Sequence, residues 1–306
     1  MAERKSSPRK KKNASIFSPE NALLRLSARE TLFNSIDETR NHEPLTFVSI
    51  DEVGRGCLAG PVVVCATLWS AHDLKPELTS WYTALRDSKK LTPARREALF
   101  NVVLEQKLLE KLWQEPPSHL AKKLLSPAIS AKGEPLKMPN SISKFSSEEM
   151  AETVKHSPSA GNANFGLTAA SIGSASAQEI DRHGIITALG LAASRALTDL
   201  PTAFSPEILF FDGNRPLKLS EPWCDLPQIL VTKGDDHLKS ISASSVIAKV
   251  VRDRWMEKYS EYFPHFGLQE NRGYGTANHR MALAKHGPTP LHRISFLKNL
   301  CPELHP

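Results

Sequence analysis

The sequence predicts an α/β fold, in which strands and helices alternate along the chain. Several short runs are rich in β-branched and aromatic residues, and segments with helix-start signals lie between them. The run at 207–211 is almost wholly apolar, as in a central strand that is buried on both faces. Alternation of strands and helices is typical of α/β domains. With 306 residues, 40% of them hydrophobic, the chain can bury a sizeable core.

Charge and cysteine content narrow the classes of function. Lys and Arg number 39 against 33 acidic residues, for a net charge of +6, which favours polyanionic partners. The four cysteines form neither a CxxC pair nor a zinc spacing, so a reducing interior is expected. The basic start is followed by polar residues, and no apolar run is long enough to span a membrane. We therefore expect a cytoplasmic protein without a membrane partner.

Composition divides the chain into segments. Residues 1–16 concentrate Lys and Arg and predict a disordered basic arm, either a solubilising tail or a contact for nucleic acid. Residues 17–45 predict a helical extension. The stretch 113–164 is rich in Pro, Ser and Lys without an apolar period, which predicts a flexible insertion, with a mobile lid as the alternative. One main domain is expected over 46–298, interrupted by that insertion, and a tail over 299–306.

Before the insertion, the pattern predicts two strands and a helix. Residues 46–50 and Pro61–Leu68 are mostly β-forming, and the glycines between them permit a tight turn. Thr92 is a good helix cap and Pro93 suits the first helical position. The apolar spacing that follows predicts a helix to about residue 112.

Five elements are predicted after the insertion, in the order strand, helix, strand, strand, helix: residues 165–172, 176–200, 207–211, 228–231 and 241–263. Ser176 and Glu179 have the spacing of a capping box, which marks the start of the first of these helices. A right-handed crossover from the first strand of the chain to the strand at 207–211 would place the two side by side and parallel.

Four carboxylates follow predicted strands: Asp51, Glu52, Asp212 and Asp235. Asp51 and Asp212 would end adjacent parallel strands, at the edge where open α/β sheets bind ligands. Because strand side chains alternate between faces, Glu52 can join Asp51 only if the strand ends or bulges at Glu52. Clustered carboxylates repel one another unless a proton or cation lies between them. Two Mg²⁺ or Mn²⁺ ions about 4 Å apart are an arrangement suited to phosphodiester cleavage.

These residues resemble a known family, the ribonuclease HII group of type 2 ribonucleases H. The similar motifs occur in order at 49–56, 87–91, 179–181, 211–214, 233–235, 242–253, 273–274 and 292–296, and the resemblance covers about residues 46–111 and 165–298. It implies a ribonuclease H-like fold, with a mixed five-stranded sheet flanked by helices and a helical C-terminal extension. Residues 46–298 would then be the catalytic domain.

The resemblance also implies an activity. Members of the family are endoribonucleases that depend on Mg²⁺ or Mn²⁺ at a two-ion site. The implied partners are RNA/DNA hybrids, in which the RNA strand is cleaved, and duplex DNA that contains ribonucleotides. Cleavage would fall on the 5′ side of a ribonucleotide and leave a 3′-hydroxyl and a 5′-phosphate. We expect the protein to be a monomer.

By motif position, the four catalytic and metal-binding places of the family fall on Asp51, Glu52, Asp212 and Asp235. Asp236 and Asp253 are rivals for the fourth place, and the family pattern in the Lys-Gly-Asp turn favours Asp235.

The resemblance assigns recognition of the ribonucleotide to Gly54, Arg55, Gly56 and Tyr274. The 2′-hydroxyl distinguishes RNA from DNA, and backbone groups exposed by glycines can approach it closely. Lys89 would contact a phosphate, with a solvated loop lysine as the alternative.

Two other interpretations stay open at this point. Ribonuclease HIII shares the carboxylates, but it lacks the arginine of the Gly-Arg-Gly turn and carries a folded N-terminal domain, so Arg55 and the short basic arm argue against it. A nucleic-acid-binding protein without catalysis would have no use for four clustered acids, which repel phosphate.

Overall fold

The structure is a computed structural model. It describes residues 46–70, 76–109, 166–203, 206–298 and 300. The expected basic arm (1–16), helical extension (17–45) and flexible insertion (113–164) lie outside the described residues.

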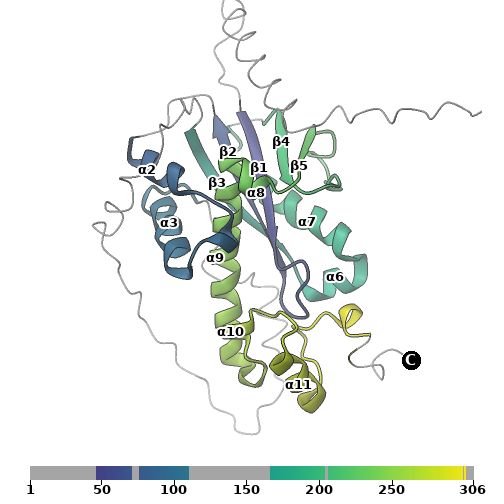
Figure 1. Cartoon of the computed structure of the whole chain (residues 1–306). Helices are drawn as coiled ribbons and strands as arrows, with labels where there is room; N and C mark the ends of the chain where they lie inside the picture. The colour runs from purple at the N-terminus through teal and green to yellow at the C-terminus, as the bar shows by residue number, and fades with distance from the viewer. Residues whose placement is uncertain (1–45, 71–75, 110–165, 204–205, 299, 301–306) are drawn as a thin grey trace, which may run out of the picture.

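A five-stranded sheet in the order β3-β2-β1-β4-β5 forms the centre of the molecule (Figure 1). Its strands are β1 (Thr46–Val53), β2 (Val62–Ser70), β3 (Gly166–Ala175), β4 (Ile208–Asp212) and β5 (Gln228–Val231). β1 pairs antiparallel with β2, which pairs antiparallel with β3, whereas β1, β4 and β5 run parallel. The predicted mixed sheet is therefore confirmed, as is the parallel pairing of the first strand with the strand at Asp212.

Helices cover both faces of the sheet. The α-helices are α2 (Pro76–Ala84), α3 (Pro93–Glu105), α6 (Ala177–His183), α7 (Ile185–Thr198), α8 (Gly234–His237), α9 (Lys239–Tyr262), α10 (Leu268–Asn271) and α11 (Ala277–His286). The 3-10 turns are η1 (Ser88–Lys90), η3 (Pro264–Phe266) and η4 (Ile294–Phe296). The long α9 crosses one face with α2 and α3 beside it, and α7 covers the other face (Figure 1). α10 and α11 form the expected helical C-terminal extension.

The alternation of side chains along β1 divides the core in two. Phe47 packs in the apolar cluster on the side of α9, whereas Val48 and Ile50 pack in the cluster on the side of α7. Ser49 also faces α9, because its side-chain Oγ donates a hydrogen bond to Ser240 Oγ of α9 at 2.8 Å. Successive strand residues point to opposite faces. Asp51, two residues beyond Ser49, therefore points toward the face that α9 covers.

The structure differs from the sequence prediction at the end of α3. The predicted helix to about residue 112 is wrong, since α3 ends at Glu105. Lys107 has a φ of 54°, and the Leu108 carbonyl accepts a hydrogen bond of 2.6 Å from Ala170 N in β3. A left-handed residue cannot continue a helix, and the edge of the sheet offers the chain a competing partner. β3 is longer than predicted and extends to Ala175, while α2 was not predicted.

Candidate active site

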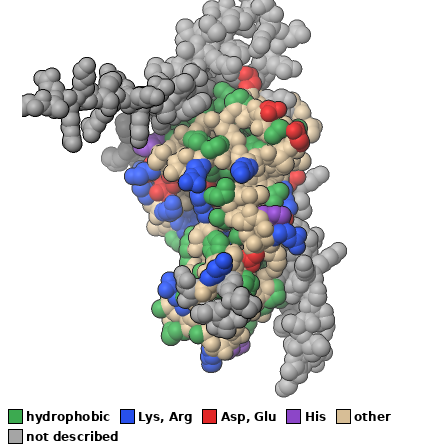
Figure 2. Space-filling view, turned by 90° about the vertical axis from the view of Figure 1, so that its right-hand side faces the viewer, with side chains coloured by type: hydrophobic (Ala, Val, Ile, Leu, Met, Phe, Trp, Pro, Cys, Tyr) green, Lys and Arg blue, Asp and Glu red, His purple; other side chains and the backbone are tan. Residues whose placement is uncertain are grey.

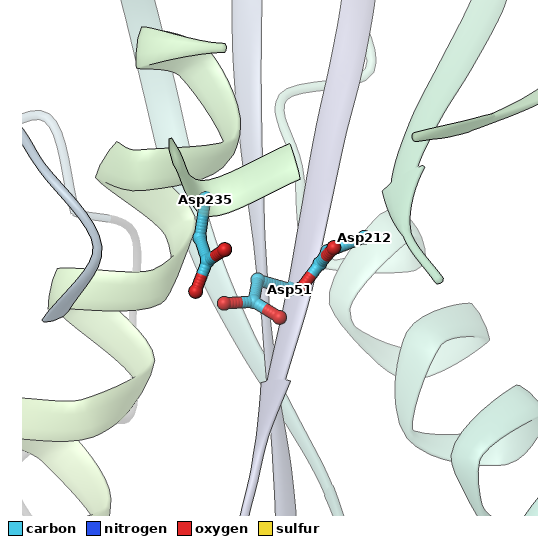
Figure 3. Close-up of side chains that lie close together, drawn as sticks. All are labelled: Asp51, Asp212 and Asp235. Carbon is cyan, nitrogen blue, oxygen red and sulfur yellow. The ribbon is translucent and has the colours of Figure 1, made fainter. Parts of the chain in front are cut away.

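Three aspartates meet at one edge of the sheet. Ile50 pairs with Phe211 in the parallel β1–β4 register. The next residue of each strand, Asp51 in β1 and Asp212 in β4, therefore lies at the same edge of the sheet. Asp235 lies in the first turn of α8, directly after β5. One carboxylate oxygen of each aspartate lies within 4.8 Å of the others (Figure 3). The structure therefore brings together three of the four carboxylates singled out in the sequence.

The turn between β5 and α8 places Asp235. Lys233 adopts a left-handed conformation with a φ of 56°, and Gly234 follows it. The Gly234 N–H donates to Asp212 Oδ1 at 2.7 Å, and Ser242 Oγ donates to the Asp235 carbonyl at 2.7 Å. A Cβ at Gly234 would lie 2.5 Å from Ile241 Cδ1, so a larger residue in this turn would displace the end of the Ile241 side chain. A backbone hydrogen bond thus joins the turn that carries Asp235 to the carboxylate that ends β4.

Glu52 lies apart from the three aspartates. β1 continues to Val53, and Glu52 pairs with Val64 without a register shift, so the expected strand end or bulge at Glu52 is wrong. Regular pairing with β2 lasts until the glycine turn, which leaves Asp51 and Glu52 on opposite faces. Glu52 Oε1 lies 3.6 Å from the Arg55 guanidinium. Its Oε2 is buried and has no hydrogen-bond partner among the described residues.

Burial and mutual repulsion raise the pKa values of all four carboxyl groups. Desolvation is the largest cause at each, raising the pKa of Glu52 to about 7 and that of Asp235 to about 6. The pKa of Asp51 rises well above its usual value through burial and then through the charges of Glu52 and Asp212. Burial also raises the pKa of Asp212, although the Gly234 N–H opposes this shift. Asp212 raises the pKa of the other three, so it is the electrostatic link of the group.

The donor set fits hard divalent cations. All four groups offer carboxylate oxygens, the ligands that Mg²⁺ and Mn²⁺ prefer. A buried oxygen without a partner, such as Glu52 Oε2, costs free energy that a cation would offset. Burial, the main cause of the raised carboxyl pKa values, makes the ionised carboxylates costly, and a bound cation would offset that cost. Asp51, Glu52, Asp212 and Asp235 could therefore hold such ions.

The rival carboxylates lie elsewhere. Asp236 is exposed and pairs with Lys90, and it lies near Asp87 and Asp235 in a second acidic group. Asp253 pairs with Lys249 at 2.7 Å on the surface of α9. Neither belongs to the group of three aspartates that includes Asp51.

The Gly-Arg-Gly turn and Tyr274 lie next to each other. Gly54 has a φ of 85°, a conformation that favours glycine, and Arg55 and Gly56 are exposed. The Leu58 N–H donates to the Gly273 carbonyl at 2.8 Å, which holds Tyr274 beside the turn. Tyr274 is 43% exposed and therefore accessible to a ligand.

Lys89 lies at the margin of the acidic site. It follows Asp87, whose side chain accepts from the Lys89 N–H at 2.8 Å at the start of η1. Its Nζ lies 4.0 Å from Asp235 Oδ2, and its side chain is 83% exposed. The ammonium group is free to approach a ligand phosphate.

Sequence reasoning assigned no role to four buried side chains near the turn: Arg252, Arg293, His279 and His292. Each is at most 2% exposed. Arg252 and Arg293 lie in motifs of the resemblance, but a motif alone does not reveal which backbone atoms a side chain will contact.

Fold and site together define a ribonuclease H-like protein with an acidic centre of the kind that holds divalent cations. None of its described helices has both the length and the apolar character needed to cross a membrane. The family model for ribonuclease HII matches residues 48–299. The chain belongs to the ribonuclease HII family, whose members depend on divalent metals, and it is an endoribonuclease that acts on RNA/DNA hybrids.

Relatives match over most of their length. The chain is 37% identical to ribonuclease HII of Synechococcus sp. (strain WH7803) over 84% of this chain and 96% of the relative. It is 35% identical to ribonuclease HII of Roseiflexus castenholzii over 82% of this chain and 81% of the relative. Among solved structures, ribonuclease H2 from Pyrococcus horikoshii OT3 aligns with a TM-score of 0.49 at 20% identity, over 85% of this chain and 99% of that chain.

Proposed function

We propose that this endoribonuclease nicks duplex DNA on the 5′ side of a single embedded ribonucleotide, leaving a 3′-hydroxyl and a 5′-phosphate, in addition to cleaving RNA/DNA hybrids. The observation that carries the proposal is the contiguity of two features. Asp51 and Glu52 lie near the end of β1, and Asp212 and Asp235 lie close to Asp51. The Gly-Arg-Gly turn begins two residues after Glu52, with Tyr274 beside it. A group that recognises one ribose therefore adjoins the acidic centre.

The four carboxylates Asp51, Glu52, Asp212 and Asp235 are the proposed ligands of two divalent cations, Mg²⁺ or Mn²⁺. Such ions, when bound, supply an activated water and stabilise the leaving oxygen of the phosphodiester. The protein keeps the ligands in place: Asp51 lies inside a paired strand, and Asp212 accepts the Gly234 N–H. The raised carboxyl pKa values mean that ions bind in competition with protons.

Recognition of the ribose is assigned to the turn and to Tyr274. The 2′-hydroxyl can both donate and accept a hydrogen bond, and Arg55 and Gly56 expose their backbone N–H groups close to solvent. The exposed Tyr274 ring can pack on the neighbouring sugar. Lys89 contributes a phosphate contact, which adds affinity but no discrimination.

The surface charge suits a duplex that is bound along its backbone. Figure 2 shows Lys and Arg side chains spread across the middle of one face among apolar side chains, with Asp and Glu side chains nearer its upper end. A modest net charge of +6 supplies non-specific attraction to phosphates and leaves selectivity to the site. We propose that a monomer suffices, since all proposed ligands come from one chain.

Asp212→Asn tests the metal-site assignment. The amide keeps the size of the side chain but removes the charge that links the carboxylates. We expect Mg²⁺- or Mn²⁺-dependent nicking of a duplex with one ribonucleotide to fall at least about a hundredfold, because losing even a group outside the ligand set costs about 10–100-fold. Binding of the duplex should persist in a gel-shift assay.

Asp236→Asn is the matched control. The same chemical change at an exposed residue that pairs with Lys90 should leave nicking near the wild-type rate. Undiminished nicking by Asp212→Asn would reject the assignment. Duplex binding by the wild-type protein without any metal-dependent cleavage would favour the non-catalytic alternative.

A further inference from the structure

His292 and Arg293 are adjacent residues near the end of the described chain. Both are buried, and neither has a role in the proposed chemistry. They are 2% and 0% exposed, respectively. Buried ionisable groups are costly unless each finds partners, so their contacts carry information. Those contacts lead to the two parts of the ribonucleotide-recognition site.

Arg293 contacts the backbone of the Gly-Arg-Gly turn. Its guanidinium donates to the Gly54 carbonyl at 2.7 Å, to the Arg55 carbonyl at 2.8 Å and to the Gly60 carbonyl at 2.9 and 3.0 Å. In a trans peptide the C=O and N–H groups point in opposite directions. The N–H groups of Arg55 and Gly56 therefore point away from the guanidinium, and within the described part of the chain neither has an acceptor. Successive free N–H groups suit an anionic or hydroxyl oxygen.

His292 reaches Tyr274 through His279, and the hydrogen bonds admit one arrangement of protons. The Thr289 N–H can only donate, and it lies 2.9 Å from His292 Nδ1, so that nitrogen carries no proton. His292 is then neutral and donates from Nε2 to His279 Nε2 at 3.0 Å. His279 in turn carries its proton on Nδ1 and donates to the Tyr274 carbonyl at 2.9 Å. Burial, in agreement, lowers the pKa of His292 to about 4.

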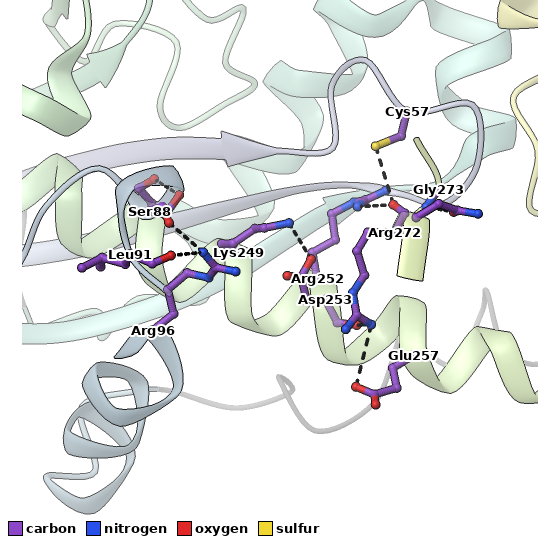
Figure 4. Close-up of polar contacts among 12 residues, drawn as sticks. Cys57, Ser88, Leu91, Arg96, Lys249, Arg252, Asp253, Glu257, Arg272 and Gly273 are labelled. Atoms are coloured by element: carbon purple, nitrogen blue, oxygen red, sulfur yellow. Dashed lines mark hydrogen bonds and ion pairs between the residues drawn. The ribbon is translucent and has the colours of Figure 1, made fainter. Parts of the chain in front are cut away.

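Further hydrogen bonds join the same segments. The Arg293 N–H donates to the Leu58 carbonyl at 2.8 Å, and the Leu58 N–H donates to the Gly273 carbonyl at 2.8 Å. Arg252, from α9, donates to the Arg272 carbonyl at 2.8 Å (Figure 4). The same set of buried hydrogen bonds thus holds both the Gly-Arg-Gly turn and the segment that carries Tyr274.

We propose that His292 and Arg293 are positioning residues that set the Gly-Arg-Gly turn and Tyr274 in register with each other, Arg293 through the carbonyls of the turn and His292 through His279. This inference rests on the proposed function, since it concerns how one ribose is recognised. Because the two residues are neighbours on one backbone, movement of either half of the recognition site is transmitted to the other. The outcome is selectivity for an isolated ribonucleotide.

Two substitutions at His292 test the chain of hydrogen bonds. His292→Phe keeps a ring but removes the donor to His279, whereas His292→Gln retains an amide N–H that can reach it. We expect His292→Phe to lower kcat/KM on a single-ribonucleotide duplex about tenfold to a hundredfold, the scale of a 1 Å misplacement. The loss on a long hybrid should stay within about threefold, because the hybrid presents many riboses to the site and its cleavage does not depend on the recognition of one of them. His292→Gln should recover most of the loss.

A double variant distinguishes a positioning role of His292 from general damage to the protein. In Tyr274→Ala, adding His292→Phe should change kcat/KM less than about twofold further, because both substitutions act through the same ring. His286→Gln, at an exposed histidine of α11, is the control and should match wild type. Full additivity with Tyr274→Ala, or equal loss on both substrates, would overturn the inference.

Arg293→Lys tests the contact between Arg293 and the Gly-Arg-Gly turn. Lysine keeps the positive charge but lacks the planar fork that serves three carbonyls at once. The same selective loss on the single-ribonucleotide duplex is expected, and a variant that cleaves both substrates as wild type does would remove Arg293 from the proposal.

A measurement on the wild-type protein needs no activity. Nitrogen NMR of ¹⁵N-histidine-labelled protein should show His292 bare at Nδ1 and protonated at Nε2, and His279 protonated at Nδ1 and bare at Nε2. Any other arrangement overturns the hydrogen-bond chain even if the variants fail to fold. Should the wild-type protein cleave hybrids but not nick single ribonucleotides, the proposed function fails, while the NMR pattern still reports on the chain itself.

Discussion

Asp212 shows how one residue joins separate elements into a site. It ends β4, accepts the N–H of Gly234 and raises the pKa values of Asp51 and Glu52, which point to opposite faces of β1. A strand cannot deliver two successive side chains to one point. A carboxylate from the neighbouring strand can lie within electrostatic reach of both. The acidic centre is therefore a property of two strands and a turn, and of no single motif.

The raised carboxyl pKa values predict how metal and pH interact. With its pKa raised from 4.5 to about 7, Glu52 binds its proton more tightly in the folded than in the unfolded protein, so its contribution to stability is present below pH 4.5 and lost as pH rises toward 7. At low pH a metal ion must displace that proton in order to bind, whereas at pH 8 the carboxylates are already ionised. Metal should therefore stabilise the protein more at pH 8.

Thermal unfolding with and without Mn²⁺ measures this effect. At a concentration of about 100 times its Kd, the ion adds about 2.7 kcal/mol, or roughly 5–10 °C in Tm for a domain of this size. We expect that rise at pH 8 and a much smaller one at pH 5.5. In Asp212→Asn the rise should nearly disappear at both pH values. An equal rise at both pH values in the wild-type protein would contradict the prediction.

At the scale of elements, the close contact of β3 with α7 supports the sheet from the side opposite α9. Gly173 in β3 lies so near α7 that an added Cβ would be 1.9 Å from the Ala192 carbonyl oxygen and 2.6 Å from Ala196 N. Ser171 Oγ donates to the Ala196 carbonyl at 2.5 Å. Backbone atoms cannot withdraw as the end of a side chain can, so glycine is required here.

Gly173→Ala should therefore destabilise the protein. Overpacking costs about 1–3 kcal/mol, which corresponds to a Tm lower by roughly 3–10 °C. Thr187→Ala, an exposed substitution on α7, should shift the free energy of unfolding by less than about 0.5 kcal/mol. Differential scanning calorimetry would check both, and an unchanged Tm in Gly173→Ala would mean that α7 can move away from the sheet at no cost.

At the scale of the whole molecule, we propose that 46–298 is the catalytic domain, interrupted at 113–164, and that 1–16, 17–45 and 299–306 are accessory. The family match over residues 48–299 supports the outer limits of this domain. Both apolar clusters and all the proposed ligands belong to it. The accessory segments are therefore expected to modulate binding and to leave the chemistry intact.

Deletion of residues 1–16 tests that division. The segment carries a dense group of Lys and Arg residues. We expect kcat to stay within about twofold of the wild-type value while the plot of log K for duplex binding against log salt concentration becomes less steep, since each phosphate contact contributes about −0.9 to the slope. An unchanged slope would identify the segment as a solubilising tail.

Much of this protein was open to prediction from local patterns. Strand residues alternate, glycines permit a left-handed turn at Gly54, and Thr92 begins a helix, because each of these depends on neighbours in the chain. The parallel pairing that joins Asp51 to Asp212 followed from the handedness of crossovers. The sequence by itself therefore determined the α/β class and the edge at which Asp51 and Asp212 meet.

Only the tertiary structure decided what depends on distant partners. The length of α3 was set by the hydrogen bond of Leu108 to β3. Glu52 was separated from the aspartates because strand pairing continued past it. Arg293 contacts Gly54, 239 positions away, and no local pattern can specify such a pair, because its free energy exists only once the fold has brought both ends together.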